Sequence, residues 1–553
     1  MKILHMKHKK DMQELVKLSL IIILAVQFCL IMYSNLTMIE KNLDCDTGKL
    51  FNHIAEIWRQ KQLLLPNWDY LTTLEWDCSS LFALPFYVLT GDIILSFGMA
   101  NILCLGGFLY IVFYLFKGED ALYPLLCANL LIIPYRVGML DYYNMLFFGG
   151  AQYIIKASLP LILIGIIIRT EYLSTVGGMS VRKWKSIIPQ KTDVSDWIIS
   201  VVYLALVLLT SISSGPYVIV CGLFPACAVY IGYKFWRWEK VPFYTIILMI
   251  MTVILALTGW KVNEIIMDGA RGNNMNFCSV YQLLGNVASC FFGMFELFGG
   301  ATENTMLPIL SVAGIQLLAK CGLVLIMLVA GVAMLVQWKK EVSLKAEIGQ
   351  SIEKNQLRPF LLISVFVWNL FILNVTNTRG GSSTYEYRYH LIGMLPLLCA
   401  TVIFILRSIQ SFRRKQQQIC LYCGGILFLL LLCLTSYKDL YSREEQNGQL
   451  KEFCAYVKDF DVEYIYLFEG SNDVDMCRVI DETSTYICLL DTGRTWAYDY
   501  YKQYVDGPVQ TENVIVAVDI EKYSFGDTFE YAGYELEKFD SVAKWELYVF
   551  KEP

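Results

Sequence analysis

The chain has 553 residues, of which 56% are hydrophobic and only 17% are charged. An ordinary globular domain carries about 25% charged residues, so a soluble fold would leave much of this apolar surface uncovered. The formal net charge of -5 is a sum over the two sides of a membrane and gives no indication of a nucleic-acid partner. The composition therefore predicts a polytopic integral membrane protein.

About eleven apolar segments are expected to cross the bilayer as helices. A hydrocarbon core of about 30 Å requires about 20 residues of helix, and no segment alternates in the way that an outer-membrane barrel requires. The segments, of which 121–135 and 216–233 are the weakest, are 18–33, 94–116, 121–135, 151–168, 197–213, 216–233, 242–260, 315–338, 360–375, 391–406 and 419–435.

The basic residues indicate how the chain is oriented. Most Lys and Arg fall before residue 18 and within 169–193, 234–240, 339–358 and 407–418, whereas the intervening connections hold few. This alternation follows the positive-inside rule, so the N-terminus is expected in the cytoplasm and the C-terminus outside. The first helix is interpreted as a retained signal anchor, because no small-residue cleavage site follows it.

Two domains are predicted, a transmembrane domain over 1–436 and a soluble extracytoplasmic α/β domain over 437–553. The second region is built from short units, with an amphipathic helix near 450–460 before the first strand. Its strands are predicted at 464–468, 486–490, 514–518, 535–539 and 546–550. Within the first outer loop, 34–80, an apolar stripe at helical spacing predicts a helix lying flat in the membrane interface, with His53, Glu56, Arg59 and Gln60 on its polar side.

Most of the seventeen Cys lie inside apolar spans, where they are small packing residues. Seven lie on the predicted outer side, and an odd number cannot all pair within one chain. A bridge between Cys45 and Cys78 stays open, since their spacing does not demand it. No Cys or His spacing is typical of a zinc or haem site, and no phosphate-binding or nucleophile-elbow motif occurs.

The most informative stretch runs from Asn42 to Thr47 and holds two carboxylates, Asp44 and Asp46, directly after the first membrane helix. A carboxylate at the membrane surface can take the proton of an acceptor hydroxyl and act as a general base. The alternative is that Asp46 caps the next helix while Asp44 is solvated.

A second polar stretch, 378–390, separates two late spans on the predicted outer side. Its Arg388 can bind phosphate oxygens in bidentate fashion, with Arg379 as a further cation. The neighbouring Tyr387 and Tyr389 suit the headgroup level and can stack on a sugar. The alternative is an aromatic belt with a snorkelling Arg. His390 is a weaker candidate at the start of a helix.

Secondary candidates lie in other outer loops. Glu75 and Asp77 place two further acidic side chains at the membrane surface just before the second span. The alternative is that they are ordinary solvated loop charges. Lys261 and Arg271 belong to a large polar loop that can face the same cavity. Lys156 and Lys320 lie near span ends, where an ionisable group is expensive unless it snorkels.

The order of these features resembles the GT-C superfamily of membrane glycosyltransferases, in its protein O-mannosyltransferase and aminoarabinose transferase branch. A signal anchor, an acidic first outer loop, an interfacial helix, about ten further helices and an outer C-terminal domain carry the resemblance, with sequence likeness confined to Asp46–Trp58, Ser80–Asp92, Asn101 and Arg388–Tyr389. The family uses an acid of the first outer loop as base or acceptor-positioning group and an Arg-Tyr pair to bind phosphate. Here Thr47 follows Asp46 where the family has an adjacent acid, so the choice between Asp46 and Asp44 stays open.

The resemblance implies an inverting glycosyltransferase of a bacterial cell envelope, which moves a sugar from a polyprenyl-phosphate donor to a glycan, lipid or protein acceptor on the extracytoplasmic face. The expected partners are the donor, the acceptor and membrane lipids, with no nucleic acid, and the outer domain is expected to shape the acceptor site or to dock a partner. No cofactor is expected either, although the carboxylate pair can bind a divalent cation weakly. The alternatives are a transporter or flippase of lipid-linked saccharides, which commonly has internal repeats and charges at the membrane midplane, and a polysaccharide polymerase or ligase.

Overall fold

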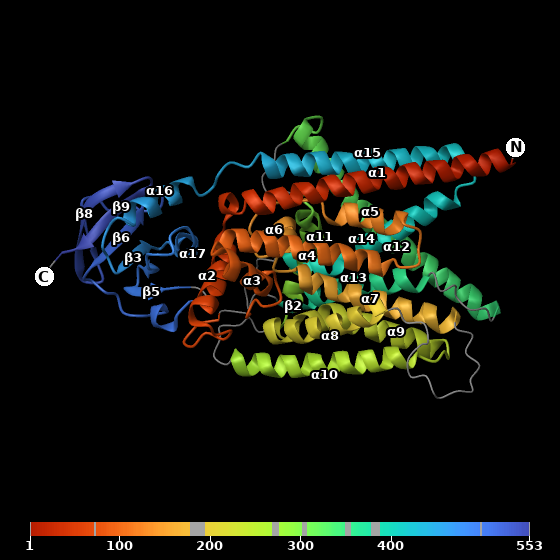
Figure 1. Ribbon diagram of the computed structural model, residues 1–553, viewed down its shortest axis with the longest axis horizontal. Helices are drawn as coiled ribbons and strands as arrows, with labels where there is room; N and C mark the ends of the chain where they lie inside the picture. Colours follow the sequence, from red (N-terminus) through yellow and green to blue (C-terminus); the bar gives the residue numbers. More distant parts are fainter. Residues whose placement is uncertain are drawn as a thin grey trace.

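The computed structural model describes residues 2–70, 73–176, 194–267, 276–300, 307–348, 356–377, 387–497 and 500–551. Long helices form a bundle, and a smaller domain with a β-sheet caps one end of it (Figure 1). We call this end of the bundle the domain end, and the opposite end, where α1 begins, the N-terminal end. The fold class expected from the sequence, a polytopic helical membrane protein with a small C-terminal α/β region, is confirmed.

Among the described residues, nine helical segments are long and apolar enough to cross a membrane. Two of them are extended by short turns, α9 by a π-helical segment, Ile219–Leu223, and α14 by a 3-10 turn, η4, Tyr387–His390. The nine helices are α1 (Lys2–Thr37), α4 (Ile93–Leu115), α8 (Val194–Ser214), α9 (Phe224–Trp236), α10 (Phe243–Ile266), α12 (Val312–Ile348), α13 (Leu357–Val375), α14 (Leu391–Ser411) and α15 (Lys415–Tyr441).

The two remaining predicted spans are also helical but differ in kind. The helix α5 (Leu122–Leu131) has only 10 residues, and α7 (Ile154–Val176) has 23 residues that include Lys156, Arg169 and Glu171. Both helices are almost completely buried in the bundle, so they do not need the uniformly apolar surface that lipid contact imposes. The shorter helices of the bundle are α3 (Ser80–Thr90), α6 (Tyr142–Phe147) and α11 (Val280–Leu297).

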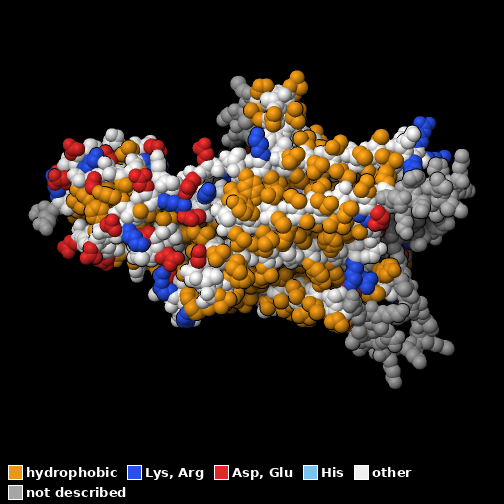
Figure 2. Space-filling view, turned by 45° about the horizontal axis from the view of Figure 1, so that its top comes forward, with side chains coloured by type: hydrophobic (Ala, Val, Ile, Leu, Met, Phe, Trp, Pro, Cys, Tyr) orange, Lys and Arg blue, Asp and Glu red, His pale blue; other side chains and the backbone are white. Residues whose placement is uncertain are grey.

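The core of the bundle lies around α14, whose most apolar window is 83% buried, compared with 22% for α1. Peripheral helices expose large apolar side chains outward, for example Ile250, Val329 and Leu427. Figure 2 shows that apolar side chains cover the flank of the bundle, whereas acidic and basic side chains gather on the C-terminal domain. This distribution is that of a multi-pass membrane protein, in which lipid solvates the flank.

The C-terminal domain contains a seven-stranded mixed sheet in the order β5-β4-β3-β6-β9-β8-β7. Strand β3 pairs parallel with β4 and β6, and the other pairs are antiparallel. The five predicted strands are confirmed, while β5 and β7 were not foreseen. The elements are α16 (Gly448–Val457), β3 (Tyr464–Phe468), α17 (Ser471–Ile480), β4 (Tyr486–Leu490), β5 (Arg494–Trp496), β6 (Val514–Asp519), β7 (Thr528–Tyr531), β8 (Tyr534–Val542) and β9 (Trp545–Phe550).

The helix α2 (Cys45–Gln60) crosses the domain end of the bundle and separates it from the C-terminal domain (Figure 1). On the domain side it packs against α17, where Asn52 Nδ2 donates to the carbonyl oxygen of Asp475 at 3.0 Å. The Tyr501 hydroxyl donates to Glu56 at 2.6 Å, and the Trp68 ring packs against the rings of Tyr500 and Tyr501.

The helix predicted in the first outer loop is therefore present, but two side chains of its polar side, His53 and Glu56, are only 4% and 5% exposed. Glu56 is covered by Tyr501 of the C-terminal domain, more than 400 residues away in sequence. His53 packs against the rings of Trp68 and Tyr70, which follow α2. The spacing of apolar residues in α2 could indicate a two-sided helix but not what would cover its polar side.

Gly48 sets how closely α17 approaches α2. A Cβ atom at Gly48 would lie 2.9 Å from the carbonyl carbon and oxygen of Asp475, whereas a Cβ at Gly107 in α4 would meet nothing within 4 Å. Replacing Gly by Ala in an exposed helix interior stabilises the helix by about 1 kcal/mol. We expect Gly107→Ala to leave the melting temperature unchanged or slightly raised, and Gly48→Ala to lower it by several degrees and to speed proteolysis of the C-terminal domain. Equal behaviour of the two variants would contradict this docking contact.

Candidate active site

The first turn of α2 is fixed by Asp44, which is the N-cap of the helix. Its backbone is extended, with φ -123° and ψ 169°, and its Oδ1 accepts the backbone N–H of Thr47 at 2.8 Å. Its Oδ2 accepts from Nδ2 of Asn144, at 3.3 Å, in α6. The sequence-based alternative assigned the cap to Asp46, and this assignment was wrong. Asp46 is left with its carboxylate outside the capping contact.

The start of α2 also packs closely on a pair of glycines after α6. Gly149 has φ +57°, and a Cβ there would lie 2.8 Å from the Thr47 hydroxyl oxygen. A Cβ at Gly150 would lie 2.0 Å from a methyl carbon of Leu50. Only glycine permits this approach without displacing neighbours, so the two glycines help to fix where the acids of α2 stand.

Asp46 is the centre of an ionic cluster at the domain end of the bundle. Lys49 Nζ lies 3.3 Å from Asp46 Oδ1 and 3.2 Å from a carboxylate oxygen of Glu75. A guanidinium nitrogen of Arg388 lies 3.9 Å from Asp46 Oδ2. The side chains of Asp46 and Arg388 are 23% and 20% exposed, so both are accessible from outside the protein. The structure thus brings together the acid and the Arg that the sequence singled out 342 positions apart.

A row of aromatic rings begins beside Arg388. Its guanidinium lies 5.5 Å from the ring centre of Tyr389, and the ring of Tyr389 packs edge to face with Tyr217. The ring of Tyr217 in turn packs edge to face with Tyr153, which directly precedes α7. Aromatic faces beside a cation and a carboxylate are suited to stacking on the apolar face of a sugar ring.

Tyr387 lies on a second polar cluster next to the first. Its hydroxyl donates to Asp141 Oδ1 at 2.5 Å, and Arg136 Nε lies 3.1 Å from the same oxygen. The Arg136 guanidinium is also 5.1 Å from the ring centre of Tyr387. Asp141 precedes α6, the helix that supplies Asn144 to Asp44, so the two clusters share one supporting element.

Asp77 is a buried structural anion. Its side chain is 0% exposed, and its two oxygens accept the hydroxyls of Ser213 and Ser214 at 2.8 Å each. Lys156 Nζ of α7 lies 3.2 Å from Asp77 Oδ1. A buried, fully satisfied pair ties the loop before α3 to α7 and α8, so neither the solvated interpretation of Asp77 nor a snorkelling Lys156 holds.

Glu75 is also not solvated, since its side chain is 13% exposed and pairs with Lys49. Its backbone has φ +54°, the left-handed region that a residue with a Cβ rarely adopts. Strain of this kind persists only where the surroundings enforce it, and it gathers at functional sites. Glu75 therefore belongs to the Asp46 cluster, whereas Asp77 supports it from behind.

The remaining sequence candidates lie elsewhere. Lys261 has a 74% exposed side chain and pairs with Glu264 of the same helix, α10. His390 is 1% exposed and packs inside the bundle at the start of α14. Arg271 and Arg379 lie outside the described residues. No cluster of three or more His, Cys, Asp or Glu side chains able to hold a metal ion occurs in the part of the chain that the structure describes.

Sequence reasoning missed several charged residues of the site. Lys49 was not among the candidates taken from the first outer loop, and Asp141 lies in a stretch without a recognisable motif. Arg443 follows α15, and its pKa is lowered by burial, against which the carboxylates of Asp141 and Asp44 act to raise it. The only available signal was that these charges border spans at the predicted outer side.

Burial raises the pKa of Asp44 to about 6, and the negative charge of Asp46 acts in the same direction. The hydrogen bonds from Thr47 and Asn144 lower this pKa and offset part of the shift.

Cys45 and Cys78 are both free thiols, so the disulfide bridge left open by the sequence is absent. Cys45 faces the sulfur of Met139 at 3.4 Å, whereas Cys78 lies 2.7 Å from the carbonyl oxygen of Glu75.

Comparison with known proteins gives a fold but no sequence relative. No protein-family model matches the chain, and no curated protein matches it. Among solved structures, ArnT from Cupriavidus metallidurans in the apo state aligns with a TM-score of 0.54 at 8% identity, covering 96% of this chain and 97% of that chain. ArnT from the same organism bound to undecaprenyl phosphate aligns over the same shares with a TM-score of 0.52 at 9% identity. The resemblance to GT-C aminoarabinose transferases is thereby confirmed at the level of the fold.

The raised pKa of Asp44 has a measurable effect on stability. Between about pH 4 and pH 6 the folded protein holds a proton on Asp44 that the unfolded chain releases, so the contribution of this group to stability falls as pH rises through that window. Asp44→Asn keeps a good cap, because Asn caps helices about as well as Asp. We expect the free energy of unfolding of Asp44→Asn, relative to wild type, to rise by on the order of 1–3 kcal/mol from pH 4 to pH 7.5.

Thermal unfolding of the two purified proteins in detergent at both pH values measures this difference. A difference between variant and wild type that is the same at pH 4 and pH 7.5 would show that Asp44 has an ordinary pKa in the folded protein.

Proposed function

We propose that the protein is a GT-C-like glycosyltransferase that moves a sugar from a polyprenyl-phosphate donor to an acceptor hydroxyl. The observation that carries the proposal is the approach of Arg388 to Asp46, within 3.9 Å, at the domain end of a membrane-spanning bundle. A general base and a phosphate-binding cation are the two groups that such a transfer requires from the protein. The ArnT fold, solved in one case with undecaprenyl phosphate bound, supports the choice of a polyprenyl-phosphate donor.

In the proposed reaction Asp46 takes the proton of the acceptor hydroxyl. At the same time the oxygen of this hydroxyl attacks the anomeric carbon of the donor sugar. The bond between that carbon and the phosphate oxygen breaks, and the electron pair leaves with the polyprenyl phosphate. Arg388 stabilises the charge of the departing phosphate through its guanidinium. Because attack and departure occur on opposite faces of the anomeric carbon, the configuration is inverted. Tyr389 and Tyr387 flank Arg388 and would orient the sugar and the phosphate.

The ionic contacts of Asp46 are long enough for a bound substrate to replace them. Its partners Lys49 and Arg388 lie at 3.3 and 3.9 Å, longer than a typical charge-assisted hydrogen bond of about 2.7–2.9 Å. A donor phosphate that binds Arg388 would draw this cation from Asp46 and leave the carboxylate free to contact the acceptor hydroxyl. Lys49, held by Glu75 on its other side, would keep the carboxylate in place.

The orientation is part of the proposal. The positive-inside pattern assigns the N-terminal end of the bundle to the cytoplasm, and the domain end, with Asp46 and Arg388, to the extracytoplasmic face. The C-terminal domain, which we assign to residues following α15, would then be extracytoplasmic and would bound the acceptor side of the site through α2. Asp44, the cap of α2, would position Asp46 and is the second choice for the base.

Transfer of radiolabelled sugar from synthetic undecaprenyl-phosphate donors in proteoliposomes tests the assignment. We expect Asp46→Asn to lower kcat by about 10²–10⁴, the usual contribution of a general base. Arg388→Gln should lower kcat/KM for the donor by about 10² or more, because the leaving phosphate loses its cation.

Matched controls come from an exposed ion pair on α10. Glu264→Gln and Lys261→Gln make the same changes of charge at side chains that are 44% and 74% exposed, and both variants should transfer sugar at the wild-type rate. Loss of transfer in Asp44→Asn with normal turnover in Asp46→Asn would move the base to Asp44. Intact movement of lipid-linked saccharide across the bilayer without turnover of any donor would contradict the transferase and favour a flippase.

A further inference from the structure

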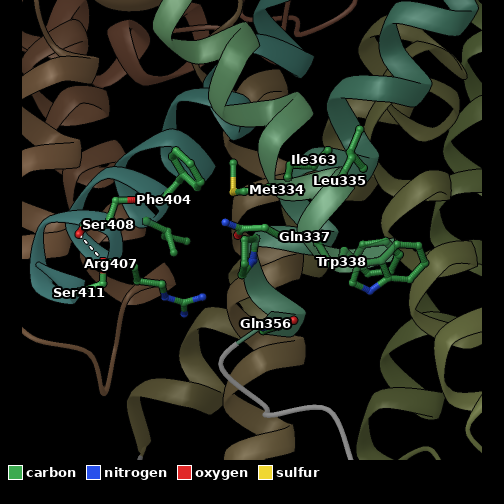
Figure 3. A pocket seen from close by; sticks show the side chains of 13 residues that line it. Met334, Leu335, Gln337, Trp338, Gln356, Ile363, Phe404, Arg407, Ser408 and Ser411 are labelled. Carbon is green, nitrogen blue, oxygen red and sulfur yellow. Dashed lines mark hydrogen bonds between the residues drawn. The ribbon is translucent and has the colours of Figure 1, made fainter. Parts of the chain in front are cut away.

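A cavity of about 210 Å³ opens at the N-terminal end of the bundle, far from Asp46 and Arg388. It lies between the end of α12, the start of α13 and the end of α14 (Figure 3). Because α14 begins directly after Arg388 and runs the length of the bundle, its last turns mark the opposite membrane surface. The cavity is therefore not part of the candidate active site.

The lining of this cavity changes from apolar to polar along the bundle axis. The helices α12 and α14 run toward the N-terminal end and α13 starts there, so residue order gives the depth of each side chain. The deeper lining is apolar and includes Met334, Leu335, Ile363, Ile403 and Phe404. The outermost lining is polar and includes Gln337, Gln356, Arg407, Ser408 and Ser411. All three helices show the same order, so the gradient belongs to the cavity and not to a single helix.

A pair of stacked aromatic rings, which we call the Trp338–Phe360 wall, and the cation Arg407 lie where the lining changes from apolar to polar. Trp338 stacks on Phe360 with ring centres 4.4 Å apart and planes inclined by 15°. Trp is enriched where the hydrocarbon core meets the headgroups. Figure 3 shows Arg407 on the opposite side of the cavity from Trp338. Phe404 and Ser411 are seven residues apart, about 10 Å along the helix, so the lining spans the depth from acyl chain to headgroup.

The charge around the polar mouth is positive. Residues 407–415 carry four basic side chains and no acidic one. Arg358, at the start of α13, hydrogen bonds to Glu119 and is only 5% exposed, so this acid is already engaged by another cation. A headgroup that enters the mouth of the cavity therefore meets a positive field. This field favours a headgroup with a net negative charge over one that is zwitterionic or neutral.

We propose that this cavity binds one anionic phospholipid of the leaflet at the N-terminal end, the cytoplasmic leaflet in the orientation proposed above. Arg407 donates to the lipid phosphate through its planar guanidinium, and Gln337 and Gln356 donate to the headgroup or the ester oxygens. The apolar lining receives the first methylene groups of an acyl chain, beside the Trp338–Phe360 wall. The bound lipid contacts all three helices, α12, α13 and α14, and so holds them together. The inference uses the orientation but not the transfer reaction.

Arg407→Gln tests the site, with Arg413→Gln as a matched control, because Arg413 is exposed, carries the same charge and does not line the cavity. The full-length protein in detergent is titrated with phosphatidylglycerol or phosphatidylcholine, and bound lipid is counted by native mass spectrometry. We expect the wild type and Arg413→Gln to retain one phosphatidylglycerol in preference to phosphatidylcholine, and Arg407→Gln to bind it about tenfold or more weakly.

Lipid binding is also measured on the wild type alone, so that the test does not depend on whether the Arg407→Gln variant folds. Saturable one-to-one retention of phosphatidylglycerol by the wild type, with a rise in melting temperature that phosphatidylcholine does not produce, supports the site by itself. Equal loss of lipid in Arg407→Gln and Arg413→Gln would reveal non-specific attraction to a basic surface and overturn the proposal. Equal retention of the two lipids by the wild type would overturn it as well. Sugar transfer measured in parallel is expected to persist in Arg407→Gln, so failure of this proposal leaves the transferase untouched.

Discussion

The cap that Asp44 places on α2 determines where Asp46, the central acid of the candidate site, stands. By accepting the N–H of Thr47 and the amide of Asn144, Asp44 starts the helix at a fixed point next to α6. Two residues later Asp46 contacts Lys49 and Arg388, and Lys49 in turn pairs with Glu75. If the helix began a residue earlier or later, Asp46 would rotate by about 100° away from these partners. The cap and the glycines at 149 and 150 thus give the site its geometry.

Much of the fold could be predicted from the sequence, because lipid imposes strong rules on the chain. Long apolar runs revealed the spans, and short continuous apolar runs revealed the buried strands β3 and β6. The spans that differ most from a lipid-exposed helix are α5 and α7, which are surrounded by protein and are therefore free to be short or to carry charges such as Lys156. The small strands β5 and β7 have too few residues to give a period.

The sequence predicted the two central residues of the candidate site. The errors in the prediction of its other residues have one cause. Asp46 and Arg388 stood out because each is a charge beside a span in a long outer loop, and the structure joins them. Asp77 had a solvated alternative, and His53 and Glu56 were assigned to the polar side of an interfacial helix, yet each is buried by residues at least 15 positions away in sequence. A single sequence reports local periodicity, whereas the burial of a polar group depends on distant partners such as Ser213, Trp68 and Tyr501. Lys49 and Asp141 were missed for the same reason.

A cryo-EM structure of the full-length protein in lipid nanodiscs with undecaprenyl phosphate would show directly whether Asp46 and Arg388 form the transfer site. We expect density for the phosphate within about 3 Å of the Arg388 guanidinium, beside Tyr389, on the same side as the Asp46 carboxylate. The polyprenyl chain should leave this position toward the apolar flank of the bundle. Density for the phosphate at another cation, with Arg388 still directed at Asp46, would contradict the central claim that these two residues form the sugar-transfer site.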